Sequence, residues 1–253
     1  MRTLLLLFVA SLAAAQTPTL QKGRQVLADF RVDPPASSVR IPVATQRSVL
    51  SKMFRRYLTD QNRCNAQFDT SNGADPLAAA RKAGQIVPSI LDVSNGSFTA
   101  SGQSQTAYLI SVSECNASHA DNFGTKRMAI FSGQQLVADV DVDFKNSIVR
   151  KTDLNSDGID ELLMTVGDMH QGELVELAAL VSLQNGRYRV IHDFGTVVED
   201  DCAAAMPGSS AKASVLYISD IVPGSMPKLS QENYSSACRA TKRWRLISRG
   251  EMK

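Results

Sequence analysis

The pattern of hydrophobic and polar residues changes twice along the chain. An apolar run from Leu4 to Leu12 is followed by a polar stretch, residues 16–45, which holds four prolines. This composition predicts an extended polar arm, with room for one short helix from Leu20 to Phe30. The periodic part of the chain therefore begins only near Gln46.

Between Gln46 and Asp60 the apolar residues recur at steps of three and four, which predicts an amphipathic helix. The stripe consists of Val49, Leu50, Met53, Phe54, Tyr57 and Leu58. A second, short helix is predicted from Pro76 to Ala83, because proline fits the first turn of a helix and Gly84 would end it. We assign residues 46–85 to a helical segment.

From residue 86 to the C-terminus, residues 86–253, short apolar or alternating runs are separated by turn residues, which is typical of β-strands. The runs are Ile86–Val93, Ala107–Val112, Arg127–Phe131, Leu136–Val142, Leu162–Val166, Leu174–Leu183, Tyr188–Ile191, Ser214–Ile218 and Trp244–Ile247. The turn signals are Asn95-Gly96, Ser132-Gly133, Asn185-Gly186 and Pro223-Gly224, and Asn185-Gly186 predicts a hairpin. The expected fold is mainly β and antiparallel, with a helical N-terminal segment.

A repeat lies within this β domain. The segments 97–110 and 153–164 share a glycine, Gly102 and Gly158, at the same offset from a following apolar run. Phe98 matches Leu154 in the same register. Gly208 indicates a weaker third copy. Each unit of about fifty residues is long enough for one four-stranded propeller blade.

The second copy of the repeat has the chemistry of a calcium loop. Calcium prefers six to eight oxygen ligands, and a glycine at the sixth loop position lets the chain turn back around the ion. The candidate ligands are Asp153, Asn155, Asp157, the carbonyl of Ile159, and Glu161. Met164 at the twelfth position excludes an EF-hand, which closes with glutamate there. Asp160 is expected to face solvent, and an Asp/Asn-rich turn without metal is the alternative.

The first copy is neutral at the equivalent positions. Ser97, Thr99, Ser101 and Gln105 replace the four side-chain ligands. This pattern indicates a loop that kept its shape and lost its metal.

With these residues in view, the loop resembles the calcium loops of FG-GAP repeats, also called VCBS-type repeats. Asp153, Asn155, Asp157, Gly158 and Glu161 match the pattern of that family. The resemblance implies an integrin-like β-propeller arrangement in which calcium has mainly a structural role. A closed propeller needs at least four blades, and only two or three are visible here. We therefore expect a partial propeller-like or sandwich-like β array.

The first fifteen residues have the features of a secretory signal peptide, residues 1–15. Arg2 precedes the apolar run, and Ala13-Ala14-Ala15 provides a cleavage site. The apolar run is too short to span a bilayer, and no later stretch is long enough. The protein is therefore expected to be secreted or periplasmic.

The four cysteines are expected to form disulfides in an oxidising compartment. Of the three possible pairings, the nearest-neighbour one joins Cys64 to Cys115 and Cys202 to Cys238. Each bond would contribute roughly 3–4 kcal/mol in the chain-entropy model. Free buried thiols are the alternative.

Charge and the remaining polar clusters give little indication of function. The chain holds 27 basic and 25 acidic residues, which gives no indication of nucleic-acid binding. The acidic residues Asp139, Asp141 and Asp143 alternate with valines, as on the solvent face of a strand, although they could also hold a second cation. The run 199–201, Glu-Asp-Asp, is expected to be a solvated turn.

No complete catalytic set is present in the sequence. Asp168 and His170 could form a carboxylate–imidazole pair, which leaves an exported hydrolase with a site near His170 as the alternative function. The preferred hypothesis is an exported, calcium-stabilised module that is non-catalytic and binds a protein or a glycan. A purely structural domain is the third possibility.

Overall fold

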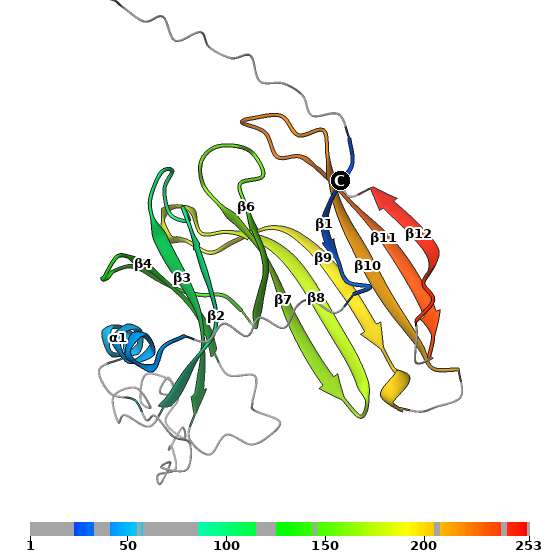
Figure 1. Ribbon diagram of the computed structural model, residues 1–253, viewed down its shortest axis with the longest axis horizontal. Helices are drawn as coiled ribbons and strands as arrows, with labels where there is room; N and C mark the ends of the chain where they lie inside the picture. The colour runs from blue at the N-terminus through cyan, green and yellow to red at the C-terminus, as the bar shows by residue number, and fades with distance from the viewer. Residues whose placement is uncertain are drawn as a thin grey trace, which may run out of the picture.

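The computed structural model describes residues 23–32, 41–54, 57, 86–114, 125–143, 146–204, 208–238 and 242–251. In these residues the protein is mainly β, with antiparallel strands and the single α-helix α1 (Val43–Met53) near the N-terminus (Figure 1). The fold class expected from the sequence is thus confirmed. The signal peptide, the short helix at 76–83 and the Cys64–Cys115 pair lie outside the described residues.

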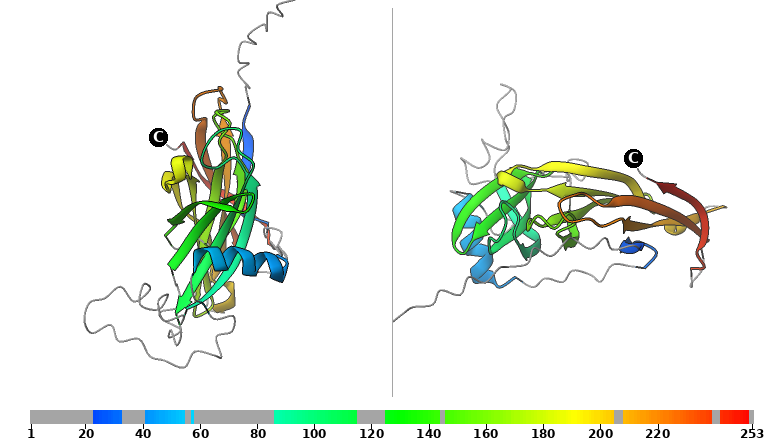
Figure 2. Two further views of the ribbon diagram at one scale, coloured as in Figure 1. Left: turned by 90° about the vertical axis from the view of Figure 1, so that its left-hand side faces the viewer. Right: turned by 90° about the horizontal axis from the view of Figure 1, so that it is seen from above.

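The strands fall into three four-stranded units. The first unit is an antiparallel meander in the order β2-β3-β4-β5. Its strands are β2 (Ile86–Gly96), β3 (Gln105–Glu114), β4 (Thr125–Ser132) and β5 (Gln135–Asp141). This unit and α1 lie at one end of the molecule, and the C-terminal strand lies at the other (Figure 2).

The second unit repeats the same meander in the order β6-β7-β8-β9. Its strands are β6 (Ser147–Thr152), β7 (Glu161–His170), β8 (Glu173–Ser182) and β9 (Arg189–Asp200). The hairpin register is the same in both units, because Gly96 pairs with Gln105 and Thr152 with Glu161. The predicted repeat is therefore present in the backbone.

The third unit is completed by a strand from the N-terminal arm. It has the order β1-β10-β11-β12, with β1 (Gln25–Asp29), β10 (Ser210–Ser219), β11 (Lys228–Ala237) and β12 (Arg245–Glu251). It joins the second unit in one eight-stranded sheet. That junction is short, since β10 pairs with β9 only at residues 211–213 and with β1 further along.

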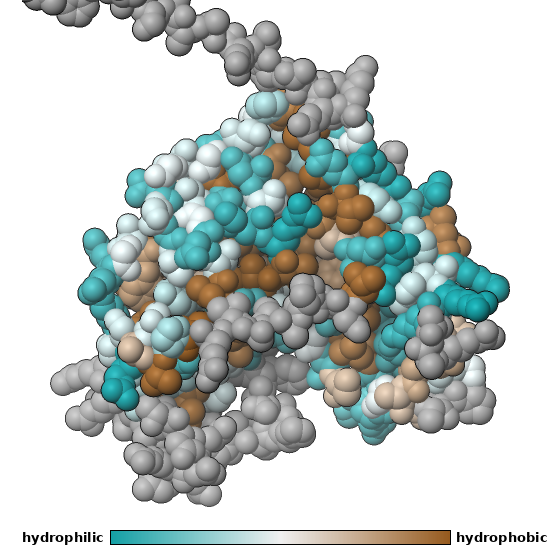
Figure 3. Space-filling view, in the orientation of Figure 1, coloured by the Kyte–Doolittle hydropathy of each residue, from teal (hydrophilic) through white to brown (hydrophobic). Residues whose placement is uncertain are grey.

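The first strands of the three units lie together. Asp92 of β2 accepts a hydrogen bond from the backbone amide of Ile148 of β6, at 2.9 Å from Oδ2. Arg150 of β6 donates to the carbonyl oxygens of Val26 and Leu27 of β1, at 3.1 and 2.9 Å. Apolar residues gather in the middle of this face (Figure 3). The units thus form a partial array around β2, β6 and β1.

The first half of β7 and the second half of β8 are buried on both faces, which explains why these stretches are apolar without alternation. Leu162 and Met164 point into the core shared with the first unit, and Leu163 points into the core shared with the third. Ala178 and Leu180 on β8 belong to the latter core as well. The second unit is therefore the central layer of the protein.

Strand β9 is bent by repeated bulges. Its register against β8 shifts three times, and the shifts leave out Ile191, Phe194 and Val197. Phe194 and Val197 are buried in the core shared with the third unit, and Ile191 packs against it. Because a bulge bends the strand and increases its twist, three of them allow β9 to lead from the second unit into the third.

Helix α1 covers the outer face of the first unit. Val49, Leu50 and Phe54 are buried against β-strand residues such as Ile110 and Phe131. The predicted stripe is confirmed for Val49, Leu50 and Met53, but the expected bounds of Gln46 to Asp60 are wrong, and Leu58 lies outside the described residues. The helix begins at Val43 and ends at Met53, because Phe54 reaches the core from an extended conformation (φ −123°, ψ 121°).

The predicted helix from Leu20 to Phe30 is wrong for its described part. Residues 25–29 form β1, which pairs with β10. Leu27 and Ala28 become buried in the core of the third unit. Local sequence did not indicate a strand here because the pairing partner lies almost two hundred residues away, so tertiary contacts decided the conformation.

All nine predicted β runs fall in strands, but besides β1 two further strands were missed. These are β6 and β11, whose residues are mostly polar. The turn predicted at Asn95-Gly96 is also wrong, because both residues pair with β3 at the end of β2. Turns are confirmed at Gly133, at Asn185-Gly186 and at Pro223-Gly224.

A disulfide joins Cys202 to Cys238, at a sequence separation of 36, as the nearest-neighbour pairing predicted. For these two cysteines the alternative of free thiols is excluded. Among the described residues, no helix has the length and apolar character needed to cross a membrane.

Candidate metal centre

The predicted calcium loop connects β6 to β7 and is held by its own side chains. Asp153 accepts backbone amide hydrogen bonds from Asp157 and Gly158, at 3.1 and 2.9 Å. Asn155 Oδ1 accepts from Asp157, and Asp157 Oδ1 accepts from Ile159, at 3.0 and 2.8 Å. The loop therefore turns around the three side chains at its first, third and fifth positions, as a calcium loop requires.

Glu161 closes the loop from the first position of β7. Its side chain is buried, and Oε2 accepts the backbone amide of Leu154 at 2.9 Å. Burial raises the pKa of Glu161 to about 7, and repulsion from Asp157 and Asp153 acts in the same direction. The hydrogen bond from Leu154 opposes that rise. Three carboxylates thus lie in one loop of nine residues, and among the described residues no basic side chain is hydrogen-bonded to them.

The oxygen atoms of the loop fit a calcium ion in their chemistry, although the three carboxylates are spaced apart. The oxygens of Asp153, Asp157 and Glu161 do not all lie within 4.8 Å of one another. The backbone amides that they accept hold them at their present positions. Each carboxylate has about four lone-pair sites, so these hydrogen bonds leave capacity for a cation. Hard oxygen donors of this kind suit calcium.

The neutral first copy has the same closing interaction. Gln105 Oε1 accepts the backbone amide of Phe98 at 2.8 Å, just as Glu161 accepts that of Leu154. Gln105 Nε2 donates to Thr99 Oγ1 at 2.6 Å. The side-chain amide of Gln105 donates directly to Thr99, the residue at the third loop position. In the second loop, the ionised carboxylate of Glu161 has no proton to donate to the equivalent atom, Asn155 Oδ1. The first loop is therefore closed by its own hydrogen bonds.

The two loops are in direct contact. Ser97 and Asp160 exchange two hydrogen bonds, from the Ser97 amide to Asp160 Oδ2 at 2.7 Å and from the Asp160 amide to the Ser97 carbonyl at 2.6 Å. The expectation that Asp160 faces solvent is therefore wrong. Its other oxygen lies 3.6 Å from Lys151 Nζ. The sequence held no signal for this role, because it depends on how the loops pack.

The second loop also reaches the third unit. The carbonyl oxygen of Asn155 accepts the backbone amide of Gly224 at 2.5 Å, in the loop between β10 and β11. The Asn185 amide donates to the carbonyl of Thr99 at 2.9 Å, which connects the first loop to the β8–β9 connection. Hydrogen bonds thus join loops from all three units at the same end of their strands.

The third predicted copy lacks the features of the other two. Gly208 has a positive φ of 91°, as Gly102 and Gly158 do. The residue three positions later is Ala211, which has no side-chain oxygen to close a loop and pairs instead with Asp200. Residues 205–207 lie outside the described residues.

The other acidic clusters are occupied by basic side chains. Arg127 bonds to Asp139 and to Asp141, each at 2.6 Å, on the solvent face of β5. The solvent-face interpretation is confirmed for these two residues, and the guanidinium lies where a second cation would have to bind. Glu199 pairs with Lys212 and Asp200 with Lys242. Both acids lie at the end of β9 rather than in the solvated turn that was expected.

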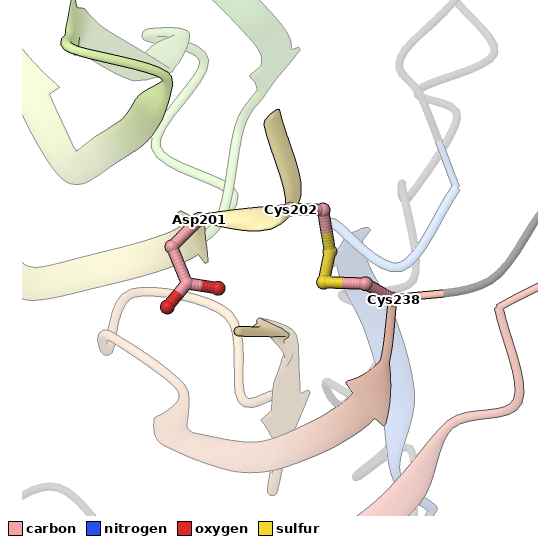
Figure 4. A group of neighbouring side chains, drawn as sticks. All are labelled: Asp201, Cys202 and Cys238. Carbon is pink, nitrogen blue, oxygen red and sulfur yellow. A yellow bond between two sulfur atoms is a disulfide. The ribbon is translucent and has the colours of Figure 1, made fainter. Parts of the chain in front are cut away.

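Asp201 lies beside the disulfide, as Figure 4 shows. One of its carboxylate oxygens and the sulfurs of Cys202 and Cys238 come within 4.8 Å of one another. Because both sulfurs are bonded in the disulfide, neither is a thiolate that could bind a metal. The disulfide is a covalent link between the end of β9 and the end of β11.

Asp168 and His170 are exposed at the end of β7, next to the hairpin that leads to β8. No hydrogen bond joins the two side chains in the structure. His170 pairs in backbone register with Glu173 across the hairpin. Among the described residues, the pair therefore has no positioned partner of the kind that general acid–base chemistry needs.

Comparisons of the chain with protein-family models, with curated proteins and with solved structures returned no match.

Proposed function

We propose that this chain is an exported, calcium-stabilised β-repeat module that acts without catalysis by binding a protein or a glycan. The sequence resemblance to FG-GAP repeats and the signal-peptide pattern support this proposal. The main support comes from the loop with the calcium donor set, which contacts the first unit through Asp160 and the third through the carbonyl of Asn155.

Asp153, Asn155, Asp157, Glu161 and the carbonyl of Ile159 would hold the ion. Calcium would neutralise the repulsion among the three carboxylates and fix the loop conformation. Because the loop lies between the first and third units, its rigidity would be transmitted to both. The ion would therefore have a structural role, and the binding surface would lie elsewhere on the sheets.

Calcium removal tests this proposal directly. We expect the melting temperature to fall in EDTA and to recover on adding calcium, since a ligand at a hundred times its Kd adds about 2.7 kcal/mol of stability. Magnesium at the same concentration should restore less, because it requires a stricter octahedral geometry. An equal melting temperature in both buffers, with no metal found by elemental analysis, would refute the calcium site.

The neutral copy supplies a matched variant. Replacing Asp153→Ser, Asn155→Thr, Asp157→Ser and Glu161→Gln gives the second loop the polar residues of the first. We expect this variant to fold, because Gln105 shows that an amide closes the loop. Its melting temperature should no longer depend on calcium. The single substitution Asp141→Asn, at an exposed strand position, should leave the calcium response unchanged.

A further inference from the structure

A basic cavity of about 410 Å³ opens on the third unit, where the start of β1 meets β10, β11 and β12. Three cationic side chains, Arg24, Lys228 and Arg249, line it together with the hydroxyls of Ser219 and Ser230. Its size lies within the usual range for small-ligand sites, which is about 300–1,000 Å³.

A buried carboxylate holds the two arginines in place. Glu232 Oε1 accepts from Arg24 at 2.6 Å and from Arg249 at 3.0 Å. Its Oε2 accepts from the hydroxyls of Tyr217 and Tyr234, at 3.0 and 2.6 Å. The Glu232 side chain is only 5% exposed. Hydrogen bonds from Tyr234 and Arg24 lower its pKa to about 2, so it is ionised at neutral pH.

The charges in this cluster do not balance. Two guanidinium groups share one carboxylate oxygen, which leaves one positive charge in excess. Arg24 lies 3.5 Å above the ring of Tyr217, and this stacking restricts its guanidinium. Lys228 pairs with Asp220 at 2.8 Å, but both side chains are exposed, and such surface pairs contribute little. The cavity thus presents a positive, hydrogen-bonding surface in which the Arg24 guanidinium is held in place.

We propose that this cavity binds the anionic groups of an acidic polysaccharide. The proposal rests on the binding function proposed above and assigns its site and ligand class. Guanidinium groups bind carboxylates and sulfates through paired N–H donors, and serine hydroxyls can bond to sugar hydroxyls. Leu229 is the single apolar side chain among the described lining residues, and it is buried, whereas the centre of a protein-binding surface is usually apolar or aromatic.

The cluster also attaches β1 to the sheet, and the two roles can be separated. The ion pair of Arg24 with Glu232 joins β1 to β11. Arg249 is not needed for that attachment, because it lies on the neighbouring strand β12 and its side chain is 71% exposed. Its substitution therefore tests ligand binding with little effect on the fold.

Titration calorimetry of the calcium-loaded mature chain provides the test. The probes are polygalacturonate for carboxylates and dextran sulfate for sulfates, with neutral dextran and poly-L-glutamate as comparators. We expect at least one acidic polysaccharide to bind, dextran not to bind, and poly-L-glutamate to bind more weakly. Arg249→Gln and Lys228→Gln should each weaken the affinity by about tenfold, the loss expected for one charge-assisted contact.

Arg189→Gln is the matched control, since it removes an exposed arginine from β9 in the second unit. Its affinity should equal that of the wild type. The proposal is overturned if neither polysaccharide binds, if Arg189→Gln weakens binding as much as Arg249→Gln, or if poly-L-glutamate binds as tightly. Melting in calcium and in EDTA, measured on the same samples, shows independently whether the proposed calcium site has failed.

Discussion

Glycine is required at position 158 both by the backbone of its own loop and by the packing of the neighbouring loop. Its φ of 82° lies in the left-handed region, which favours glycine. A Cβ atom at this position would also overlap the side chain of Ser101 in the first loop. Gly102 has a similar φ of 71°, but nothing lies within 4 Å of the place where its Cβ would be. The two copies therefore need their glycines to different degrees.

Alanine substitutions should separate the two requirements. Gly102→Ala should lower the free energy of unfolding by about 1 kcal/mol, the usual cost of a left-handed backbone. Gly158→Ala should cost roughly 2–4 kcal/mol, because the overlap with Ser101 adds to that strain. Urea unfolding in saturating calcium gives both values. Equal losses for the two variants would show that the loops are not packed against each other at Ser101.

At the scale of elements, β1 of the third unit and β9 of the second show why parts of the eight-stranded sheet were difficult to predict. The apolar residues of β9 follow a spacing of three, Ile191, Phe194 and Val197, because each one is left out of the register at a bulge. Neither the helical nor the strand period describes such a segment. β1 is only five residues long and lies in a polar arm. Its stability depends on pairing with β10 and on the burial of Leu27.

Adjacent residues of β1 provide a test of its place in the fold. Leu27 is 2% exposed and Val26 is 48% exposed. Leu27→Ala should therefore cost about 2–4 kcal/mol, as large-to-small substitutions in a core do. Val26→Ala should cost less than about 1 kcal/mol. Chemical unfolding measures both, and two equally small losses would indicate that this segment is a loosely attached arm after all.

At the scale of the whole molecule, the second unit is joined to both other units at one end of its strands and to the third unit alone at the opposite end. Its calcium-type loop contacts the first unit through Ser97 and the third through Gly224. At the opposite end, the disulfide joins Cys202 after β9 to Cys238 after β11. The sheet between the second and third units is continuous over only three residue pairs. These end contacts therefore stabilise a junction that has few backbone hydrogen bonds.

Removing the disulfide should weaken that junction. The bond closes a loop of 36 residues, which corresponds to about 4 kcal/mol in the chain-entropy model. The double variant Cys202→Ser/Cys238→Ser should lose stability of this order in urea, measured with calcium present. A loss below about 1 kcal/mol would show that the hydrogen bonds and the core already hold the two units together.

Much of the candidate metal centre could be predicted from sequence, because its ligands lie within nine residues of one another. The turn at Gly158, the inward side chains and the closing role of Glu161 follow from local spacing. The similarity to the first copy was also visible, since Gln105 stands in the same register. The role of Asp160 could not be predicted, because it depends on contact with Ser97 in another loop.

The sequence by itself determined the local features: the mainly β fold, nine of the strands, the stripe of α1, the repeated loop and the Cys202–Cys238 pair. These depend on periodicity, turn chemistry and short-range spacing. Only the tertiary structure decided the β conformation of residues 25–29, the polar strand β11 and the cavity around Arg24 and Arg249. Arg24 and Glu232 are 208 residues apart, so no local pattern could indicate their contact. Their side chains meet only because β1 pairs with β10.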